Sequence, residues 1–232
     1  MSELLRCENL TKQFGMITAV NNINLTLETG RIIGLLGPNG SGKTTLIKMI
    51  NGLLQPTSGE IYVCSEKPGP ISKLQVAYLP DNNFLNSWMT VKQIVSYFEE
   101  FYYDFRTELA YSMLERLGIS PERKLKNLSK GNKEKVALIL VMSRNANLYV
   151  LDEPIAGVDP ATRDFIISTI INNYNPSASV LISTHLISDI ESILDEVIFL
   201  KNGNIVLHKT VDEIREEHEM SVDELFREVF KW

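Results

Sequence analysis

The chain has 232 residues, of which 44% are hydrophobic and 22% are charged, and its formal net charge is −6. These values are typical of a globular protein with a buried core, and the acidic balance argues against a nucleic-acid partner bound through phosphate neutralisation. The longest apolar run, Val136–Met142, is far shorter than the roughly 20 residues that a membrane-spanning helix needs.

The N-terminal third predicts short strands followed by a strand–loop–helix unit. Leu4–Leu10 and Ile23–Leu27 have the residue types of short strands, and Arg31–Leu36 is a compact apolar strand. A glycine-rich turn follows, and a helical stretch runs from Lys43 to about Asn51. We therefore expect a small N-terminal antiparallel β subdomain joined to the start of an α/β core.

The middle of the chain, residues 82–145, lacks clear strand patterns and is predicted to be helical. Thr90 is a good cap for a helix over Val91–Tyr102, and Thr107–Leu117 is amphipathic. A third helix is expected over Asn132–Ser143. We interpret this segment as an α-helical subdomain inserted into the α/β core.

The α/β pattern then resumes and continues almost to the end of the chain. The expected elements are strand Leu148–Asp152, helix Pro160–Tyr174, strand Ser179–Ser183, helix Leu186–Ile193 and the hairpin of Val197–Leu200 with Ile205–His208. Strands that alternate with helices indicate a parallel sheet covered on both faces. Two short helices close the chain, and Ser221 with Glu224 has the spacing of a capping box. The expected division is 1–81 and 146–210 for the core with its β subdomain, 82–145 for the helical subdomain and 211–232 for the C-terminal helices.

The glycine-rich turn fits the pattern G-x-x-x-x-G-K-[ST] of a phosphate-binding loop. Its residues are Gly37, Pro38, Asn39, Gly40, Ser41, Gly42, Lys43 and Thr44, followed by Thr45. Glycines let backbone N–H groups surround phosphates, the lysine reaches the β- and γ-phosphates, and the hydroxyl of Thr44 suits Mg²⁺. A plain turn before a helix is the alternative, and the strand and helix on either side favour nucleotide binding.

Two carboxylates follow the apolar strand at residues 148–151, the first strand after the helical segment. At the carboxyl end of a parallel strand, Asp152 is placed to hold Mg²⁺ and Glu153 to activate the attacking water as a general base. The alternative for this pair is a solvated acidic turn. His185 follows the next apolar strand, where it is either a packed core histidine or a contact to the γ-phosphate that stabilises the transition state.

Taken together, the motifs resemble those of the ABC (ATP-binding cassette) ATPase family over nearly the whole chain. The corresponding segments are Phe14 for the aromatic residue on adenine, Gly37–Thr45 for the phosphate loop, Tyr78–Asp81 for the Q-loop, Leu128–Asn132 for the signature, Leu148–Pro154 for the Walker B strand, Gly157–Pro160 for the D-loop and His185 for the switch histidine. The resemblance implies a P-loop NTPase fold with a RecA-like α/β core.

The resemblance also implies how ATP and Mg²⁺ are bound. Thr44, Asp81 and Asp152 are expected at the metal, while Lys43, Glu153 and His185 act on the terminal phosphate. In this family two ATPase subunits close head to tail over two ATP molecules. Nucleotide contacts from the opposing subunit are accordingly implied for Ser129, Gly131, Asn132 and Asp159.

Two positions depart from the family pattern. Asp81 stands where the family usually has glutamine, which puts an additional negative charge beside the γ-phosphate. In the signature, Lys130 replaces a glycine and Asn132 replaces a glutamine. Lys130 either adds attraction to phosphate or is a solvated side chain.

Sequence similarity around the motifs, such as LSKGNKEKV and DEPIAGVDP, is to ATPase subunits of bacterial ABC-2-type exporters often encoded beside a GntR-type regulator. This similarity implies a motor subunit that lies at the cytoplasmic face of the membrane. Its partners are then an integral membrane permease and a second ATPase subunit, either an identical copy or a paralogue. The alternatives are a soluble assembly factor of the same family and a nucleotide-sensing module that hydrolyses ATP weakly.

Overall fold

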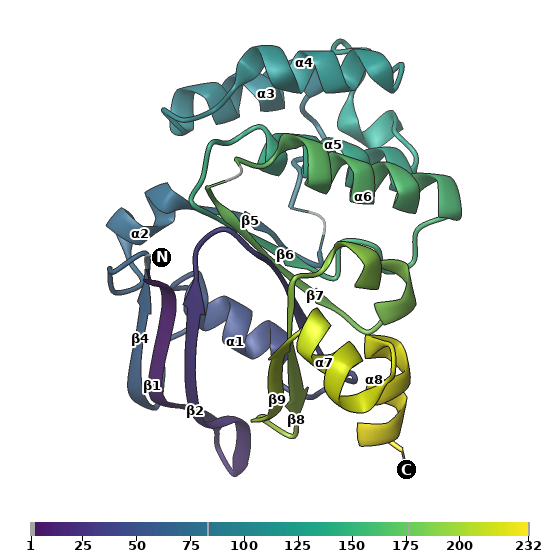
Figure 1. Cartoon of the computed structure of the whole chain (residues 1–232). Helices are drawn as coiled ribbons and strands as arrows, with labels where there is room; N and C mark the ends of the chain where they lie inside the picture. The colour runs from purple at the N-terminus through teal and green to yellow at the C-terminus, as the bar shows by residue number, and fades with distance from the viewer. Residues whose placement is uncertain (1–2, 83, 176, 232) are drawn as a thin grey trace.

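The computed structural model describes residues 3–82, 84–175 and 177–231, and its fold class is α/β (Figure 1). Six strands form the central sheet in the order β5-β6-β7-β3-β8-β9. They are β3 (Ile32–Leu36), β5 (Val76–Leu79), β6 (Leu148–Asp152), β7 (Ser179–Thr184), β8 (Glu196–Lys201) and β9 (Asn204–Thr210). All neighbours are parallel except β8 and β9, which form the expected C-terminal hairpin.

The central strands β3, β6 and β7 are buried along their whole length. Continuous apolar runs of this kind occur where both faces of a parallel sheet are covered. Register brings their carboxyl ends to one edge, because Leu36 pairs with Thr184 and Asp152 pairs with Ser183. The loops that follow Leu36, Asp152 and Thr184 leave the sheet at this edge.

A second, antiparallel sheet has the order β2-β1-β4, with β1 at Glu3–Phe14, β2 at Ile17–Glu28 and β4 at Ser58–Val63. The expected N-terminal strands are confirmed but are longer than predicted, and β4 was not predicted. Helix α1 (Lys43–Ile50) buries Leu46 and Ile47 in the same core cluster as side chains of both sheets. This helix therefore joins the small sheet to the central one.

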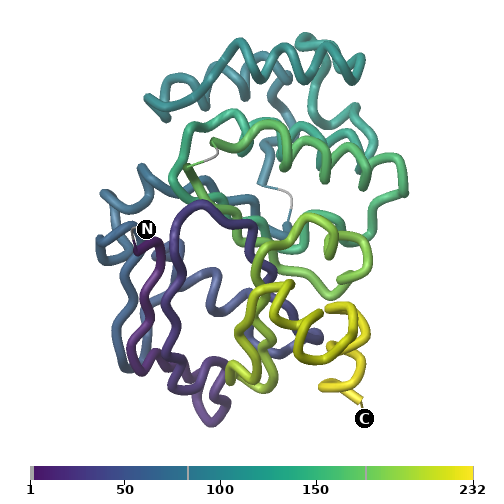
Figure 2. The backbone as a smooth tube through the Cα atoms, in the orientation of Figure 1, coloured from purple at the N-terminus to yellow at the C-terminus, as the bar shows by residue number. Residues whose placement is uncertain are grey.

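The helices between β5 and β6 form a separate layer over the central sheet. Figure 2 shows the chain leaving the sheet, building this layer at the top of the view and returning beside its point of departure. The layer contains α3 (Val91–Phe101), α4 (Thr107–Arg116), the 3₁₀ turn Leu125–Asn127 and α5 (Lys130–Met142). As predicted, Thr90 caps α3, since its Oγ1 accepts from the amide of Gln93.

The other helices are α2 (Pro70–Gln75), α6 (Pro160–Asn173), α7 (Val211–His218) and α8 (Val222–Val229). The capping box at Ser221 and Glu224 is confirmed at the start of α8. Phe226 and Phe230 of this last segment pack on Phe199 of β8, with ring centroids 5.4 and 6.0 Å from it. The C-terminal helices are thus anchored on the central sheet.

The predicted helix over Leu186–Ile193 is wrong. The segment forms two 3₁₀ turns, Ile187–Asp189 and Glu191–Ile193. An eight-residue helix gains little on its own, and here the carboxylate of Glu191 accepts hydrogen bonds from the first amides of α8 instead. Tertiary contacts therefore decide the conformation of this segment.

A buried arginine ties the helical layer to the central sheet. The guanidinium of Arg144 donates to the carbonyl oxygens of Val76 and Leu74 at 2.6 and 2.7 Å, and it pairs with Asp104 at 3.0 Å. The Arg144 side chain is 3% exposed and that of Asp104 is 7% exposed. Loss of one partner would leave the other charge buried without compensation.

We predict that Arg144→Met lowers the free energy of unfolding by about 3–5 kcal/mol, because Asp104 and two carbonyl groups lose their donor. Urea unfolding followed by circular dichroism measures this change. Arg116→Met is the matched control at an exposed position, where the expected change is within about 0.5 kcal/mol. Equal effects of the two substitutions would contradict the assigned role of Arg144.

Candidate functional site

The loop between β3 and α1 has a backbone path that only glycine can follow at two positions. A Cβ on Gly37 would lie 2.4 Å from the carbonyl oxygen of Leu200. Gly42 has a φ of +110°, and a Cβ there would lie 2.3 Å from the carbonyl oxygen of Ala19. No side chain caps α1 at Gly42. The first amides of α1 are therefore left facing the loop, which is the arrangement that binds phosphate.

Lys43 is the first residue of α1 and is only 6% exposed. Its ammonium group donates to the carbonyl oxygen of Gly37 at 2.7 Å and lies 3.4 Å from the carboxylate of Glu153. These two oxygen partners fix the position of the Lys43 ammonium group. The lysine of the loop and the acid after β6 thus meet in one site.

Asp152 is 1% exposed and ends β6. Its Oδ1 accepts from the hydroxyl of Ser183 at 2.5 Å and lies 3.5 Å from that of Thr44, while its buried Oδ2 has no hydrogen-bond partner among the described residues. Burial raises the pKa of Asp152 and the nearby charges of Asp81 and Glu153 act in the same direction, whereas the bond from Ser183 opposes them. The Oδ2 atom of Asp152 is therefore a buried hydrogen-bond acceptor without a donor among the described residues.

Glu153 has an unusual backbone for a residue other than glycine, with a φ of +50°. Its amide donates to the backbone carbonyl oxygen of Ser183 and to that residue's hydroxyl, both at 3.0 Å. The side chain is 15% exposed and its Oε2 lies 3.0 Å from Nδ1 of His185. Strain of this kind is common at functional positions. Here it turns the carboxylate toward both Lys43 and His185.

The oxygen atoms at this edge of the sheet fit a magnesium ion. Asp152 offers an unpaired buried oxygen, Thr44 a hydroxyl beside it, and Asp81 lines the same phosphate-loop cavity as Thr44. Among the described residues no three His, Cys, Asp or Glu side chains are close enough to hold a metal by themselves. Mg²⁺ needs no such cage, because it binds one or two carboxylates together with water and substrate phosphates.

Not every residue singled out by the sequence lies in this cavity. Its lining consists of Ala19, Asn39, Gly40, Ser41, Gly42, Lys43, Thr44, Thr45, Asp81 and Glu153. Phe14 is instead on the N-terminal sheet, 49% exposed, with the ammonium group of Lys12 5.3 Å from its ring centroid. Sequence reasoning overlooked Ser183, whose place beside Asp152 follows from strand register and not from any local motif.

The signature and the D-loop meet each other rather than the phosphate loop. Ser129 caps α5 by accepting from the amide of Asn132 at 3.2 Å, and Asp159 caps α6 by accepting from the amide of Thr162 at 3.0 Å. A Cβ on Gly131 would lie 3.5 Å from Oγ1 of Thr162. The N-termini of α5 and α6 are therefore adjacent, and neither belongs to the lining of the phosphate-loop cavity.

Comparisons with known proteins agree with this geometry. Residues 20–156 match the family model described as "ABC transporter". The "ABC transporter ATP-binding protein YtrB" of Bacillus subtilis (strain 168) is 30% identical over 93% of this chain and 75% of its own length. The "SkfA peptide export ATP-binding protein SkfE" of the same organism is 27% identical, with 99% and 98% covered. A solved structure described as the ATP binding subunit of an ABC transporter is 27% identical and superposes with a TM-score of 0.88, over 98% of this chain and 100% of that one.

The chain belongs to the ABC transporter family and has the fold of its ATPase cassette. It is an ATP-binding subunit, whose hydrolysis of ATP drives transport. In the described ranges, no helix has the length and apolarity to cross a membrane.

We predict that Asp152→Asn stabilises the nucleotide-free protein by about 1 kcal/mol at pH 7, because it removes a buried charge without breaking the bond from Ser183. A carboxyl whose folded pKa is raised costs stability above that pKa and costs nothing below its unfolded value, which is ordinarily 3.8. The gain should therefore disappear as the pH falls toward 4.

Chemical unfolding at several pH values measures this effect, with Asp164→Asn, at an exposed position, as the control. The same variant should lose the rise in melting temperature that Mg-ATP gives the unmodified protein. A variant that is less stable than the parent at pH 7, or that keeps the full Mg-ATP shift, would contradict the role given to Asp152.

Proposed function

We propose that this chain is the motor of an export system, in which two ATPase subunits close over two Mg-ATP molecules at the cytoplasmic face of a membrane permease. The observation that carries the nucleotide chemistry is that Lys43 and Glu153 meet in the lining of the phosphate-loop cavity, with His185 in contact with Glu153. The helix N-terminus, the lysine and the carboxylate then surround one terminal phosphoryl group.

Each side chain has a distinct task in this proposal. Lys43 and the amides of α1 bind the β- and γ-phosphates, and Thr44, Asp81 and Asp152 hold the magnesium ion, which neutralises charge on those phosphates. Glu153 accepts a proton from the attacking water. His185, 3.0 Å from Glu153, keeps that carboxylate oriented and faces the oxygen atoms that become more negative in the transition state.

The lining of the phosphate-loop cavity supports a dimer, because the helical layer of the same subunit does not cover the cavity. Its lining contains no residue of the helical layer, although Ser129 at the N-terminus of α5 is exposed. In a head-to-tail dimer, Ser129, Gly131 and Asn132 of one subunit cover the nucleotide of the other, and Asp159 lies at the same interface. Phe14 stacks on the adenine from the subunit that holds the phosphates. ATP then acts as the adhesive between subunits, and its hydrolysis releases them.

We predict that Glu153→Gln retains ATP binding, lowers turnover by about 10²–10⁴-fold and accumulates as a dimer in Mg-ATP, because the general base is lost while the phosphate contacts remain. Lys43→Ala should fail to bind ATP. Phosphate release and size-exclusion chromatography with light scattering measure these outcomes, with the exposed Glu99→Gln as the control. Turnover of Glu153→Gln at the parental rate would refute the assignment.

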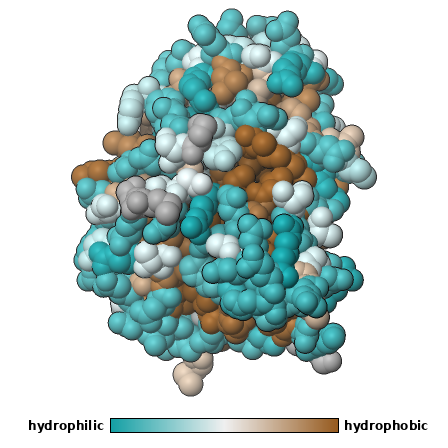
Figure 3. Space-filling view, viewed as in Figure 1, coloured by the Kyte–Doolittle hydropathy of each residue, from teal (hydrophilic) through white to brown (hydrophobic). Residues whose placement is uncertain are grey.

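An apolar groove supports the permease as the second partner. It has a volume of about 700 Å³ and lies between the β5 edge with α2 and the face of α3. Its exposed lining includes Leu53 (57%), Leu74 (45%), Tyr97 (52%) and Phe101 (64%). Figure 3 shows apolar side chains gathered at the left edge, at the level of α2. A groove of this shape and polarity fits an amphipathic helix from a membrane protein.

The groove and the nucleotide site share one segment of chain. Pro80 and Phe84 line the groove and also line the cleft next to Glu153, while Asp81 between them lines the phosphate-loop cavity. Of the apolar residues that follow Asp81, Phe84 lines the groove, whereas Leu85 is buried in the core and Trp88 lies outside the lining. A helix in the groove would therefore contact the segment that carries a metal-site residue.

The export assignment and the ABC-2-type subgroup with its GntR-type regulator rest on the sequence around the motifs. The name of SkfE as a peptide export protein supports the export assignment. The apolar groove favours a membrane partner over the soluble assembly factor, because a protein without that partner would leave the groove uncovered. Weak hydrolysis is the second candidate, and Asp81 is the observation that favours it, because a carboxylate lies where the family has a neutral amide.

We predict that Phe101→Glu abolishes co-purification with the membrane permease, because a charge enters the lining of an apolar groove, while ATP binding by the isolated subunit is unchanged. Tyr103→Glu is the matched control, since Tyr103 is 81% exposed and lies outside the groove. Co-purification of the Phe101→Glu variant at the control level would rule out this surface as the docking site.

A further inference from the structure

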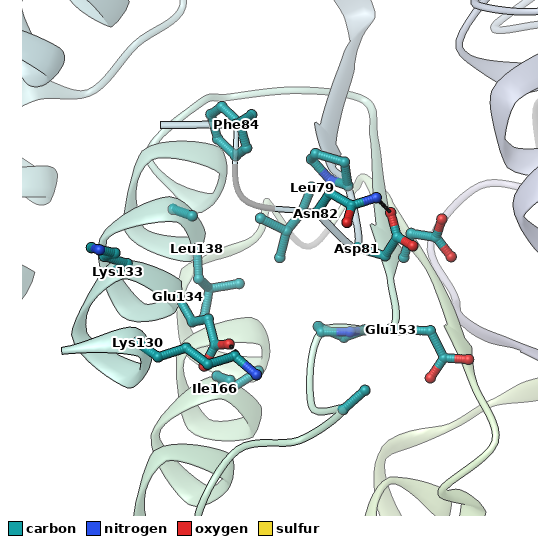
Figure 4. A pocket seen from close by; sticks show the side chains of 15 residues that line it. Leu79, Asp81, Asn82, Phe84, Lys130, Lys133, Glu134, Leu138, Glu153 and Ile166 are labelled. Carbon is teal, nitrogen blue, oxygen red and sulfur yellow. Dashed lines mark hydrogen bonds and ion pairs between the residues drawn. The ribbon is translucent and has the colours of Figure 1, made fainter. Parts of the chain in front are cut away.

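A cleft of about 310 Å³ between the central sheet and α5 has walls of opposite charge. One wall, at the ends of β5 and β6, carries Asp81, Asp152 and Glu153. The other, on α5, carries Lys130 and Lys133 together with Glu134, so it is positive in net charge. Figure 4 shows the ammonium group of Lys130 extending from α5 toward the wall that carries Glu153. The cleft thus contains the two residues at which the chain departs in charge from its family, Asp81 and Lys130.

The acidic wall carries more negative charge than its cations balance. Glu153 is paired with Lys43, but Asp81 forms no ion pair in the described part of the chain and accepts only the side-chain amide of Asn82, at 2.8 Å. Asp81 also lines the phosphate-loop cavity. Mg-ATP carries net negative charge even with its magnesium ion, and Asp152 already faces that ion, so an anionic Asp81 at this place favours a further cation beside it.

Lys130 is a cation without a strong partner. It is the first residue of α5, its side chain is 78% exposed, and its nearest acid is Glu134 at 3.8 Å. Exposed pairs at this distance contribute little, so the ammonium group is free to take another anion. Lys130 lies between Ser129 and Gly131, the residues assigned to the nucleotide of the opposing subunit.

We propose that Asp81 and Lys130 are a complementary charge pair across the dimer interface, in which Lys130 of one subunit balances Asp81 beside the nucleotide held by the other. The pair restores the charge of a site that would hold a neutral amide and a glycine in the usual family pattern. Within one subunit the two side chains line the same cleft but form no ion pair among the described residues, so this inference rests on the head-to-tail dimer of the proposed function. It also makes the two departures one coupled change rather than two separate ones.

The test is a double-mutant cycle on ATP-driven dimerisation. Every chain carries Glu153→Gln so that ATP is retained, and sedimentation velocity in Mg-ATP gives the dimer dissociation constant. We expect Lys130→Gln to weaken the dimer about tenfold when Asp81 is present and less than about threefold when Asp81→Gln is also present. Lys126→Gln removes an exposed lysine outside the cleft and should have no coupling to Asp81.

Mixed dimers separate pairing between subunits from pairing within one subunit. When the Asp81→Gln chain is mixed with the Lys130→Gln chain, one nucleotide site contains both charges and the other contains neither, provided that the pair spans the interface. Energy transfer between two labelled chains gives the dissociation constant of the mixed dimer. After correction for the statistical factor of two, it should be lower than the geometric mean of the dissociation constants of the two homodimers.

Three results would overturn the proposal. Equal effects of Lys130→Gln with and without Asp81 would show that the charges are independent. If the cycle shows coupling but the dissociation constant of the mixed dimer equals the geometric mean, the pair lies within one subunit. If the Glu153→Gln parent itself stays monomeric in Mg-ATP, the proposed dimer fails and the pairing falls with it.

Discussion

The site depends on the parallel register of β3, β6 and β7, which ends three buried strands at the same edge. Asp152 is opposite Ser183, and Leu36, the last residue before the phosphate loop, is opposite Thr184. Polar groups that are far apart in the chain therefore come together without any local motif that joins them. The apolar side chains of the three strands supply the burial that keeps this arrangement in place.

Several buried features at this edge lower the stability of the empty protein, and the proposed function explains them. Asp152 keeps an oxygen without a partner in the described structure, Glu153 holds a left-handed backbone, and Lys43 is almost completely covered. The unpaired oxygen of Asp152 and the strained backbone of Glu153 destabilise the empty protein, and a bound magnesium ion would supply the partner that Asp152 lacks. Binding and stability are therefore coupled, so nucleotide should protect this region most strongly.

Local patterns predicted most of the elements and most of the residues that line the phosphate-loop cavity. The apolar strands, the helix after Gly42 and the caps at Thr90 and Ser221 all have causes within a few residues, so the sequence alone is enough to locate them. The helix expected over Leu186–Ile193 failed because Glu191 is used to cap α8, a contact that no local pattern contains. The part of Ser183 in the site and the groove between α2 and α3 likewise depend on pairing and packing between distant segments.

A crystal structure of the Glu153→Gln variant with Mg-ATP would show whether Lys43 and the residue at position 153 reach the same terminal phosphoryl group. We expect the ammonium nitrogen of Lys43 and the side-chain amide at position 153 each to lie within about 3.5 Å of a γ-phosphate oxygen or of a water bound to it. A γ-phosphate bound away from both side chains would refute the proposed site.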